Sequence, residues 1–284
     1  MTKSFNVSSQ TTVKWPQIVA GLSAAGGAFA VGAALGWPSP ASSLIGHNDR
    51  YFPITASQFG WVASIITLGC AVSCLPIGFL MNKFGRKKTM LSLVVPFMVG
   101  WLLVIWAQNF PMLMTGRFIL GLAGGAFCVS APQYSAEIAE KEIRGVLGTF
   151  FQLLVIAGIL FSYTVGAFAP IFITSIVCSI IPLVFGAIFC FMPESPVYLV
   201  IQKRESEAVQ SYKWLRGSSY EPQSEIDELK QDILESENNK VSMKEVFGRK
   251  STIRALTIGF GLMFFQQMSG INVVVFFSTT IFKV

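Results

Sequence analysis

Long apolar runs separated by short charged segments set the organisation of this chain. The runs are about as long as the 20 or so apolar residues that a helix needs to cross the hydrocarbon core of a bilayer. Charged or proline-containing turns divide them. This pattern predicts membrane-spanning helices at residues 17–37, 57–80, 90–107, 111–133, 146–168, 171–192 and 255–284.

The segment between the sixth and seventh predicted spans has a different character. It is rich in charge and carries short amphipathic patterns, which indicate helices with one solvated face. The predicted organisation is a tail (1–16), a six-helix transmembrane bundle (17–193), a cytosolic helical linker (194–254) and a seventh transmembrane helix (255–284). The predicted fold class is therefore an all-α membrane protein.

Composition supports this class and excludes several functions. Hydrophobic residues make up 52% of the chain and charged residues 13%, against about 25% charged in soluble domains. Of the 21 Lys and Arg residues, all but Arg50, Arg117 and Lys283 lie in the tail, the linker or the loops on the same side as these. This asymmetry predicts a cytosolic N-terminus. The same asymmetry explains the net charge of +6, so the charge does not indicate a nucleic-acid partner.

The sequence contains little that would support catalysis or metal binding. The five cysteines all lie in apolar stretches, where they are expected to be free packing residues. The single histidine, His47, has no neighbouring set of ligands, and no acid–base pair lies inside the predicted spans. We therefore expect a protein that is not an enzyme and has neither a metal nor a cofactor.

Three amide side chains in the seventh predicted span are the strongest candidate binding residues. Gln266, Gln267 and Asn272 lie in a stretch without charge, and an amide can pair with an uncharged hydroxyl either as donor or as acceptor. On an ideal helix Gln267 and Asn272 would point about 140° apart. A break at Ser269-Gly270 would turn all three towards one pocket, as in the interrupted helices of transporters. The alternative is that they join helices together.

Arg117 is a charge within the fourth predicted span, which makes it a candidate functional residue. The alternative is that it lies near the outer end of the span and extends its side chain to the membrane surface. The sequence leaves both interpretations open.

Five local patterns follow one another along the chain: GFLMNKFGRKK (78–88), GRFILG (116–121), PQYSAEIAEKEIRG (132–145), PESP (193–196) and FQQMSGIN (265–272). Together they resemble the sugar porter family of the major facilitator superfamily. The first departs from the general signature by having Asn82 at its acidic position. YKWLRG (212–217) is most similar to the insect facilitated trehalose transporter branch.

The resemblance implies a fold of two six-helix halves around a central site, of which this chain would hold the first half, the linker and one helix of the second. It implies that sugar is contacted by Gln152 from the first half and by Gln266, Gln267 and Asn272 from the second. It also implies a cytoplasmic network of charges that changes between conformations. The residues assigned to this gate are Arg86, Arg117, Glu137, Arg144 and Glu194.

These expectations combine into a facilitative transporter of trehalose or a hexose that works by alternating access. We expect it to be an incomplete chain and to lie in the plasma membrane. Proton-coupled relatives carry an aspartate just after a glycine corresponding to about Gly32, where this chain has Ala33 and Ala34. Its partners would be the sugar and the bilayer, and its oligomeric state is unknown. The alternatives are a truncated regulator or sugar sensor that does not transport, and a seven-helix receptor, which would place the N-terminus outside.

Overall fold

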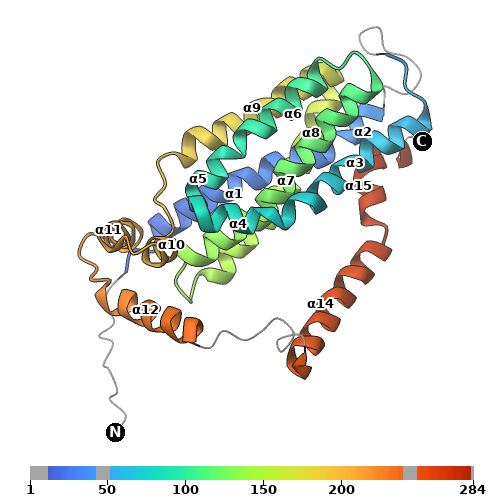
Figure 1. Ribbon diagram of the computed structural model, residues 1–284. Coiled ribbons are helices and arrows are strands. Elements are labelled where there is room, and N and C mark those ends of the chain that lie inside the picture. The colour runs from blue at the N-terminus through green and yellow to red at the C-terminus, as the bar shows by residue number, and fades with distance from the viewer. Residues whose placement is uncertain (1–11, 43–51, 239–247, 283–284) are drawn as a thin grey trace.

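A computed structural model describes residues 12–42, 52–238 and 248–282 and shows a long bundle of helices with the charged linker at one end (Figure 1). Seven segments within these residues are long and apolar enough to cross a membrane. His47 and Arg50 lie outside the described residues. The bundle consists of α1 (Trp15–Gly36), α2 (Pro38–Ala41), α3 (Ala56–Cys74), α4 (Pro76–Phe84), α5 (Arg86–Ser92), α6 (Val94–Ile105), α7 (Phe110–Ile138), α8 (Arg144–Phe168) and α9 (Ile171–Phe189).

All seven predicted spans are present in the predicted order. The second is not the continuous helix expected over 57–80, because α3 ends at Cys74 and α4 begins at Pro76. Proline lacks the N–H that would continue the helical hydrogen bonds, so it fits at the start of a helix and interrupts its interior. Asn109 caps the fourth span by accepting a hydrogen bond from the N–H of Met112 at 2.9 Å.

Small residues allow the bundle helices to approach closely. A Cβ atom added at Gly32 of α1 would lie 2.0 Å from the carbonyl oxygen of Val155 in α8. One added at Gly121 of α7 would lie 2.1 Å from the carbonyl oxygen of Ile66 in α3. Larger side chains would force these pairs of helices apart, so the glycines specify which helices lie against each other.

Aromatic rings fill the centre of the bundle. Phe127 of α7 contacts the rings of Phe97 in α6 and Phe185 in α9, with centroids 5.7 and 5.0 Å away. Phe189 continues the series to Tyr134, where α7 approaches the linker. Such offset and edge-to-face pairs add to the burial of apolar surface. These rings join α6, α7 and α9 near the end of α9.

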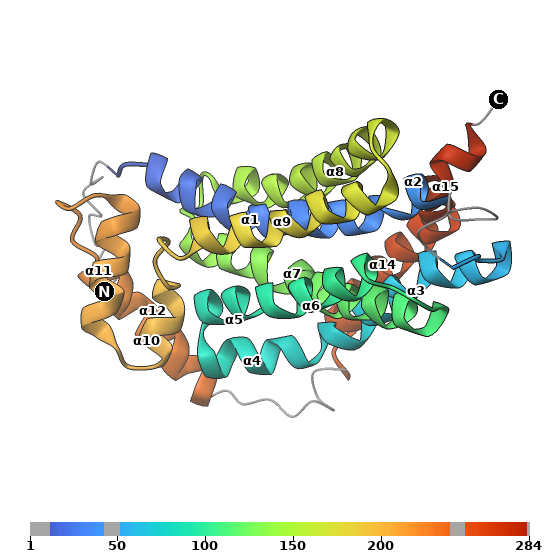
Figure 2. The ribbon, with the colours of Figure 1, turned by 90° about the horizontal axis from the view of Figure 1, so that it is seen from above.

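Three helices of the linker lie at the end of the bundle where α7 ends and α8 begins (Figure 2). We call this end of the bundle the linker end. They are α10 (Pro196–Ile201), α11 (Glu205–Arg216) and α12 (Gln223–Asn238). The side chain of Ser195 caps α10. Gly217 ends α11. Tyr198, Tyr212 and Ile226 form a small apolar core of their own between these helices.

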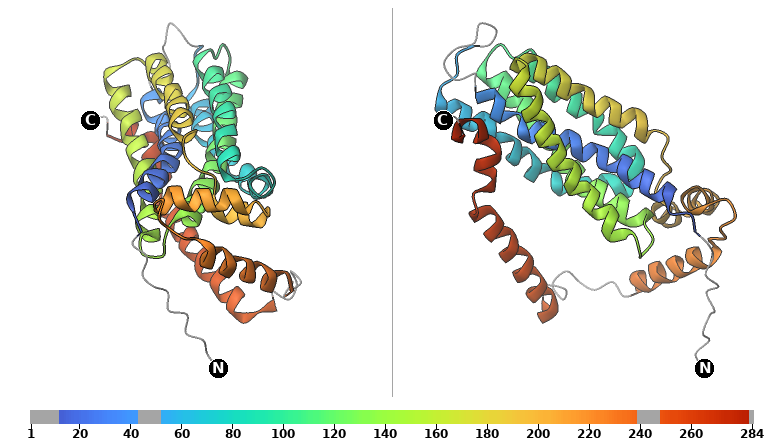
Figure 3. Two further views of the ribbon diagram at one scale, coloured as in Figure 1. Left: turned by 90° about the vertical axis from the view of Figure 1, so that its left-hand side faces the viewer. Right: turned by 180° about the vertical axis from the view of Figure 1, so that it is seen from behind.

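The seventh span consists of two helices in different surroundings. The first, α14 (Lys250–Met268), has no buried residue and stands clear of the bundle (Figures 1 and 3). The second, α15 (Ile271–Ile281), returns to the bundle at the end opposite the linker, where Phe277 packs edge-on against Phe59 of α3. The amide-bearing stretch therefore lies at the junction between a free helix and a docked one.

Candidate functional site

The seventh span is broken at Ser269 and Gly270, where the sequence predicted a break. Gly270 has φ +73°, a left-handed conformation that glycine adopts without strain. The break brings Asn272 to Gln267, whose side-chain oxygen accepts a hydrogen bond from the Asn272 amide at 2.6 Å. Gln266 precedes this pair and its side chain is exposed. Three uncharged side chains, each able to donate and accept, are thus gathered on one exposed turn.

Gln152 lies on the exposed surface of α8, with its side chain outside the packed core. Tyr163 lies eleven residues further along α8, about three helical turns, and therefore on the same face to within about 20°. The Tyr163 hydroxyl donates a hydrogen bond to the carbonyl of Val275 in α15. The face of α8 that carries Gln152 is therefore also the face from which Tyr163 contacts α15.

A second contact attaches α15 to the bundle near this face. The backbone N–H of Thr279 donates to the Ser39 hydroxyl at 3.0 Å, and the Thr279 hydroxyl donates to the Ser39 carbonyl. Together with the contacts of Phe277 and Tyr163, these bonds attach α15 to the end of the bundle opposite the linker. The sequence analysis did not find Ser39, Tyr163 or Thr279, because hydroxyl residues in apolar helices are common and carry no distinctive spacing.

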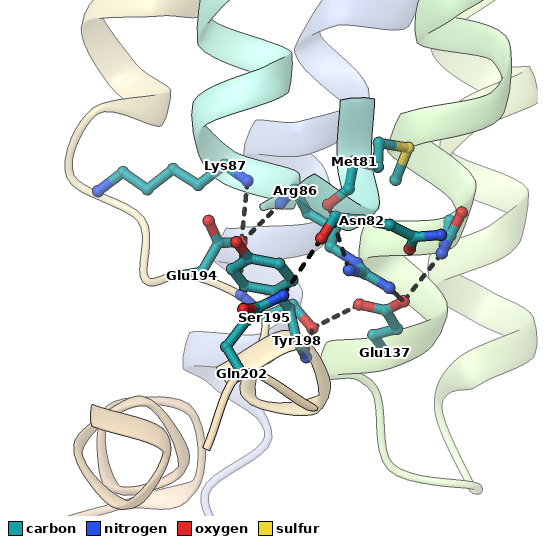
Figure 4. Close-up of polar contacts among 10 residues, drawn as sticks. Met81, Asn82, Arg86, Lys87, Glu137, Glu194, Ser195, Tyr198 and Gln202 are labelled. Atoms are coloured by element: carbon teal, nitrogen blue, oxygen red, sulfur yellow. Dashed lines mark hydrogen bonds and ion pairs between the residues drawn. The ribbon is translucent and has the colours of Figure 1, made fainter. Parts of the chain in front are cut away.

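Three of the predicted gate residues meet at the linker end (Figure 4). The Arg86 guanidinium donates to Glu137 Oε1 through Nη2 at 2.8 Å and through Nε at 3.1 Å. Ser195 donates its hydroxyl to Glu137 Oε2, and the Tyr198 ring stacks 5.2 Å from the guanidinium carbon. Glu194 completes the group, which we call the Arg86 cluster.

Glu194 joins the Arg86 cluster through the backbone. Its Oε1 atom accepts hydrogen bonds from the N–H groups of Arg86 and Lys87, both at 2.9 Å. These are the first residues of α5, so the carboxylate occupies the positive end of that helix. Gly85 has φ +94° there, and a Cβ at this position would lie 2.4 Å from Glu194 Oε2. Glycine thus allows the carboxylate to approach.

The Arg86 cluster connects three segments that are distant in sequence: the turn between α4 and α5, the end of α7, and the start of α10. The side chains of Arg86 and Glu137 are 4% and 13% exposed, so water screens the pair weakly. Removing one partner of a buried ion pair costs about 3–5 kcal/mol, because the other charge stays buried and unpaired. A substitution that removes either partner should therefore be costly for as long as these segments stay together.

Arg117 does not extend to the membrane surface, and that alternative is wrong. Its side chain is fully buried beside Trp37, with the guanidinium carbon 5.2 Å from the ring. It donates to the carbonyl of Ala34 at 2.6 Å and of Val62 at 3.2 Å, thereby joining α1, α3 and α7. Among the described residues it meets no carboxylate. The structure places Arg117 far from the Arg86 cluster, and its role in a gate stays a prediction.

Arg144 is exposed at the start of α8 and makes no ion pair among the described residues. The arginine that is paired in this region is Arg216, at the end of α11, which the sequence analysis did not single out. Arg216 lies between the Tyr212 and Tyr220 rings, at 4.9 and 5.0 Å, and donates two hydrogen bonds to Glu225. Burial opposes the charge, but the bonds to Glu225 outweigh it and raise the pKa of Arg216.

The contacts of Arg216 extend to the beginning of α1. Its Nε lies 3.5 Å from Glu140 Oε1, which also accepts a hydrogen bond from the Gln17 amide at 2.9 Å. Nearby, a hydrogen bond and charge attraction to Glu142 raise the pKa of the exposed Lys14, and the same contacts lower the pKa of Glu142. The end of α11 is therefore attached both to α12, through Glu225, and to the start of the first span, through Glu140 and Gln17.

Comparisons with known proteins agree with this architecture. The family described as "Sugar (and other) transporter" matches residues 6–284. The chain is 34% identical over 254 residues to glucose transporter type 3 of Drosophila melanogaster, covering 88% of this chain and 50% of that protein. It is 32% identical over 270 residues to the facilitated trehalose transporter Tret1 of Apis mellifera ligustica, covering 94% and 54%. The chain thus spans about half the length, or less, of the curated relatives it matches.

Solved structures show the same fold. The xylose transporter XylE from E. coli, in a partially occluded inward-open conformation, superposes with a TM-score of 0.71 at 22% identity, covering 93% of this chain and 64% of that one. The proton:xylose symporter XylE bound to 6-bromo-6-deoxy-D-glucose gives 0.74 at 21% identity, covering 94% and 62%. The predicted fold is confirmed: six spans, a helical linker and one further span. The chain belongs to the sugar transporter family of the major facilitator superfamily, a family of transporters rather than enzymes.

Proposed function

We propose that this chain provides the sugar-binding first half, the linker and the seventh span of a facilitative transporter for trehalose or a hexose. It would work by alternating access in the plasma membrane, with the tail and linker in the cytosol. Its substrate would be bound without covalent chemistry. The hydroxyl groups of the sugar would exchange water for amide side chains as the two halves of the transporter move around the ligand.

The observation that carries this proposal is the break in the seventh span. It brings Asn272 to Gln267 and leaves Gln266 exposed beside them, in a stretch that crosses the membrane. Exposed amides at membrane depth are costly in lipid, but they are suitable in a watery cavity that receives a polar ligand. Their lack of charge matches a ligand that is rich in hydroxyls and poor in charge.

Gln152 supports the same site from the bundle. It shares a face of α8 with Tyr163, which contacts α15. In the proposed cycle Gln152 would therefore face the amides of the seventh span when α14 closes against the bundle. Among the described residues the structure shows no hydrogen bond of the Gln152 amide, so its donor and acceptor remain available to a ligand.

The Arg86 cluster would act as the cytosolic gate. The charges of Arg86 and Glu137 are paired, and Glu194 caps α5, in the arrangement that the structure shows. Opening at this end would break these contacts and closing would restore them. The Arg86 cluster would therefore set the balance between conformations and would not contact the sugar itself.

Transport should need no proton gradient. In α1, residues Trp15–Gly36 include no carboxylate, and Arg117 donates instead to the backbone carbonyl of Ala34. A carboxylate that loads and releases a proton inside the membrane would be needed for coupling. With none on α1, a passive mechanism is the simpler one.

The test is uptake of labelled sugar by a chimera in proteoliposomes. Residues 1–284 would be joined to the part of Apis mellifera Tret1 that follows its matching region, so that both halves of the fold are present. We expect saturable uptake of trehalose or glucose that is unchanged by an imposed pH gradient. A folded chimera that binds no sugar, while the Apis parent is active in the same lipids, would contradict the proposal and favour a regulatory role. Uptake that follows the pH gradient would contradict the passive mechanism.

A further inference from the structure

An apolar groove lies between α1, α8 and α9. Both α8 and α9 pack against α1 at this side of the bundle (Figure 2). It encloses about 460 Å³. Gly26 and Phe29 of α1 form its floor, Leu154 and Phe161 of α8 line one wall, and residues of α9 including Ile180 line the other. The Ile180 side chain is 49% exposed, so the groove is open to the surroundings of the bundle.

Gly26 deepens this groove, unlike other glycines of α1. A Cβ at Gly32 would meet the backbone of Val155 at 2.0 Å, so glycine there is needed for helix approach. A Cβ at Gly26 would meet only the Phe185 ring, at an ordinary contact distance of 3.5 Å. A larger residue at position 26 would therefore fit by filling the groove. Helix packing therefore does not require glycine at this position.

The depth of the groove in the membrane determines what can fill it. Gly26, Leu154 and Ile180 lie near the middle of their spans, about 15 Å from the helix ends at 1.5 Å per residue. All the lining side chains are apolar, so water would find no hydrogen-bonding partner there. If the groove were empty, its walls would lose their dispersion contacts. The hydrocarbon of the bilayer is the material available at this depth.

We propose that the groove binds one acyl chain of a membrane phospholipid. A flexible chain can lie over Phe29 and Phe161, whose rings contact each other with centroids 5.4 Å apart and a tilt of 54°. A sterol suits the site less well. Its fused rings are rigid and need a flat wall, and its hydroxyl group would have no polar side chain to meet among the lining residues.

The bound chain supports α8 from behind. Leu154 lies two residues from Gln152, about 160° around the helix, so the groove and the exposed amide are on opposite faces of α8. An acyl chain between α8 and α9 would limit the movement of α8 away from the face that carries Gln152. This consequence depends on the proposed function, whereas binding of the chain does not.

Photo-crosslinking of the full chain in nanodiscs tests the binding. The probe is phosphatidylcholine with a diazirine in the middle of one acyl chain, and adducts are located by mass spectrometry of peptides. We expect adducts concentrated at Leu154, Phe161 and Ile180, severalfold above those at exposed positions of α6 such as Val95. Ile180→Trp should reduce the adducts severalfold by filling the groove. Ile188→Trp is the matched control, because Ile188 is on the same helix, is also 49% exposed and does not line the groove.

Gly26→Leu gives a second, independent way to fill the groove if the tryptophan variant fails to fold, as judged by circular dichroism and size-exclusion chromatography. Adducts spread evenly over the lipid-facing surface, or unchanged in folded Ile180→Trp and Gly26→Leu variants, would overturn the proposal. Displacement by cholesterol at an equal mole fraction would assign the groove to a sterol and would also overturn it. Sugar binding is measured separately on the same samples, so failure of the transport proposal does not affect this result.

Discussion

At the scale of single residues, the described part of the chain uses charge and amide groups in different ways. The charges of Arg86 and Glu137 are buried and paired, so their free energy depends strongly on whether the pair is intact. The amides of Gln152, Gln266 and Gln267 are exposed in spans that cross the membrane, where they are ready to meet a polar ligand. Under the proposed function, the charges would control conformation and the amides would bind an uncharged sugar.

Gln152→Ala is expected to weaken sugar binding without reducing folding stability. The change would leave a sugar hydroxyl without its partner, which costs about 1–3 kcal/mol, or roughly 5- to 150-fold in the dissociation constant. Equilibrium binding of labelled sugar to the full transporter or chimera measures the effect. Leu153→Ala, at the adjacent exposed position, is the control and should bind normally. Unchanged affinity in the Gln152 variant at normal expression would refute the assignment.

Glu137→Gln is expected to change the transport rate more than the sugar dissociation constant. The substitution preserves shape but leaves the Arg86 guanidinium without its carboxylate partner, and so shifts the balance between conformations. Initial rates of uptake and equilibrium binding should be measured on the same preparation. Glu142→Gln is the matched control. That carboxylate is 71% exposed and its surface pair with Lys14 should contribute little. A loss of binding with an unaltered rate would be the opposite of the expected outcome.

At the scale of elements, close helix contacts depend on single small residues. Gly32→Ala is expected to destabilise the bundle by about 1–3 kcal/mol, because the new methyl group would press on the Val155 carbonyl and separate α1 from α8. Gly26→Ala on the same helix should be tolerated, since its methyl group would meet the Phe185 ring at an ordinary distance. Thermal unfolding in detergent compares the two variants. Equal midpoints would mean that the α1–α8 contact is softer than the structure indicates.

The break between α14 and α15 depends on one backbone conformation. Gly270→Ala should cost about 1–2 kcal/mol, the usual penalty for a side chain in the left-handed region, since no neighbouring atom would contact the new methyl group. Gly261→Ala in α14 also has open space but is helical, and should be neutral or slightly stabilising. We expect weaker sugar binding in the first variant alone, because the bond between Asn272 and Gln267 requires the break. Normal sugar binding by the Gly270→Ala variant would show that the binding site does not depend on the break.

At the scale of the whole molecule, the seventh span presents its amides without a facing bundle among the described residues. Alternating access requires two halves that move around a shared site. A polypeptide of residues 1–284 alone is therefore expected to give no saturable sugar uptake in proteoliposomes, whereas the chimera with the second half of Apis Tret1 should. Saturable, inhibitor-sensitive uptake by residues 1–284 alone would instead point to two copies that form one transport unit.

The spans, the break in the seventh helix and the residue types of the site could be predicted from the sequence. Apolar runs of sufficient length indicate membrane helices because every backbone group in lipid needs an internal hydrogen bond. Gly270 marked the break because few other residues adopt its conformation. The position of Arg117 could not be predicted, since the same charge in the same span can reach either the surface or the backbone carbonyls of other helices.

The sequence by itself determined that this protein crosses the membrane several times, which end carries the charged linker, and which uncharged groups could meet a sugar. These properties depend on local composition and on hydrogen bonding within single helices. Only the tertiary structure decided that Arg86, Glu137 and Glu194 meet while Arg144 does not, and that Arg216 joins the linker to Glu140. It also decided that an apolar groove lies on the face of α8 opposite Gln152. Such contacts depend on how closely helices far apart in sequence approach, and that distance is set by the packing of many side chains together.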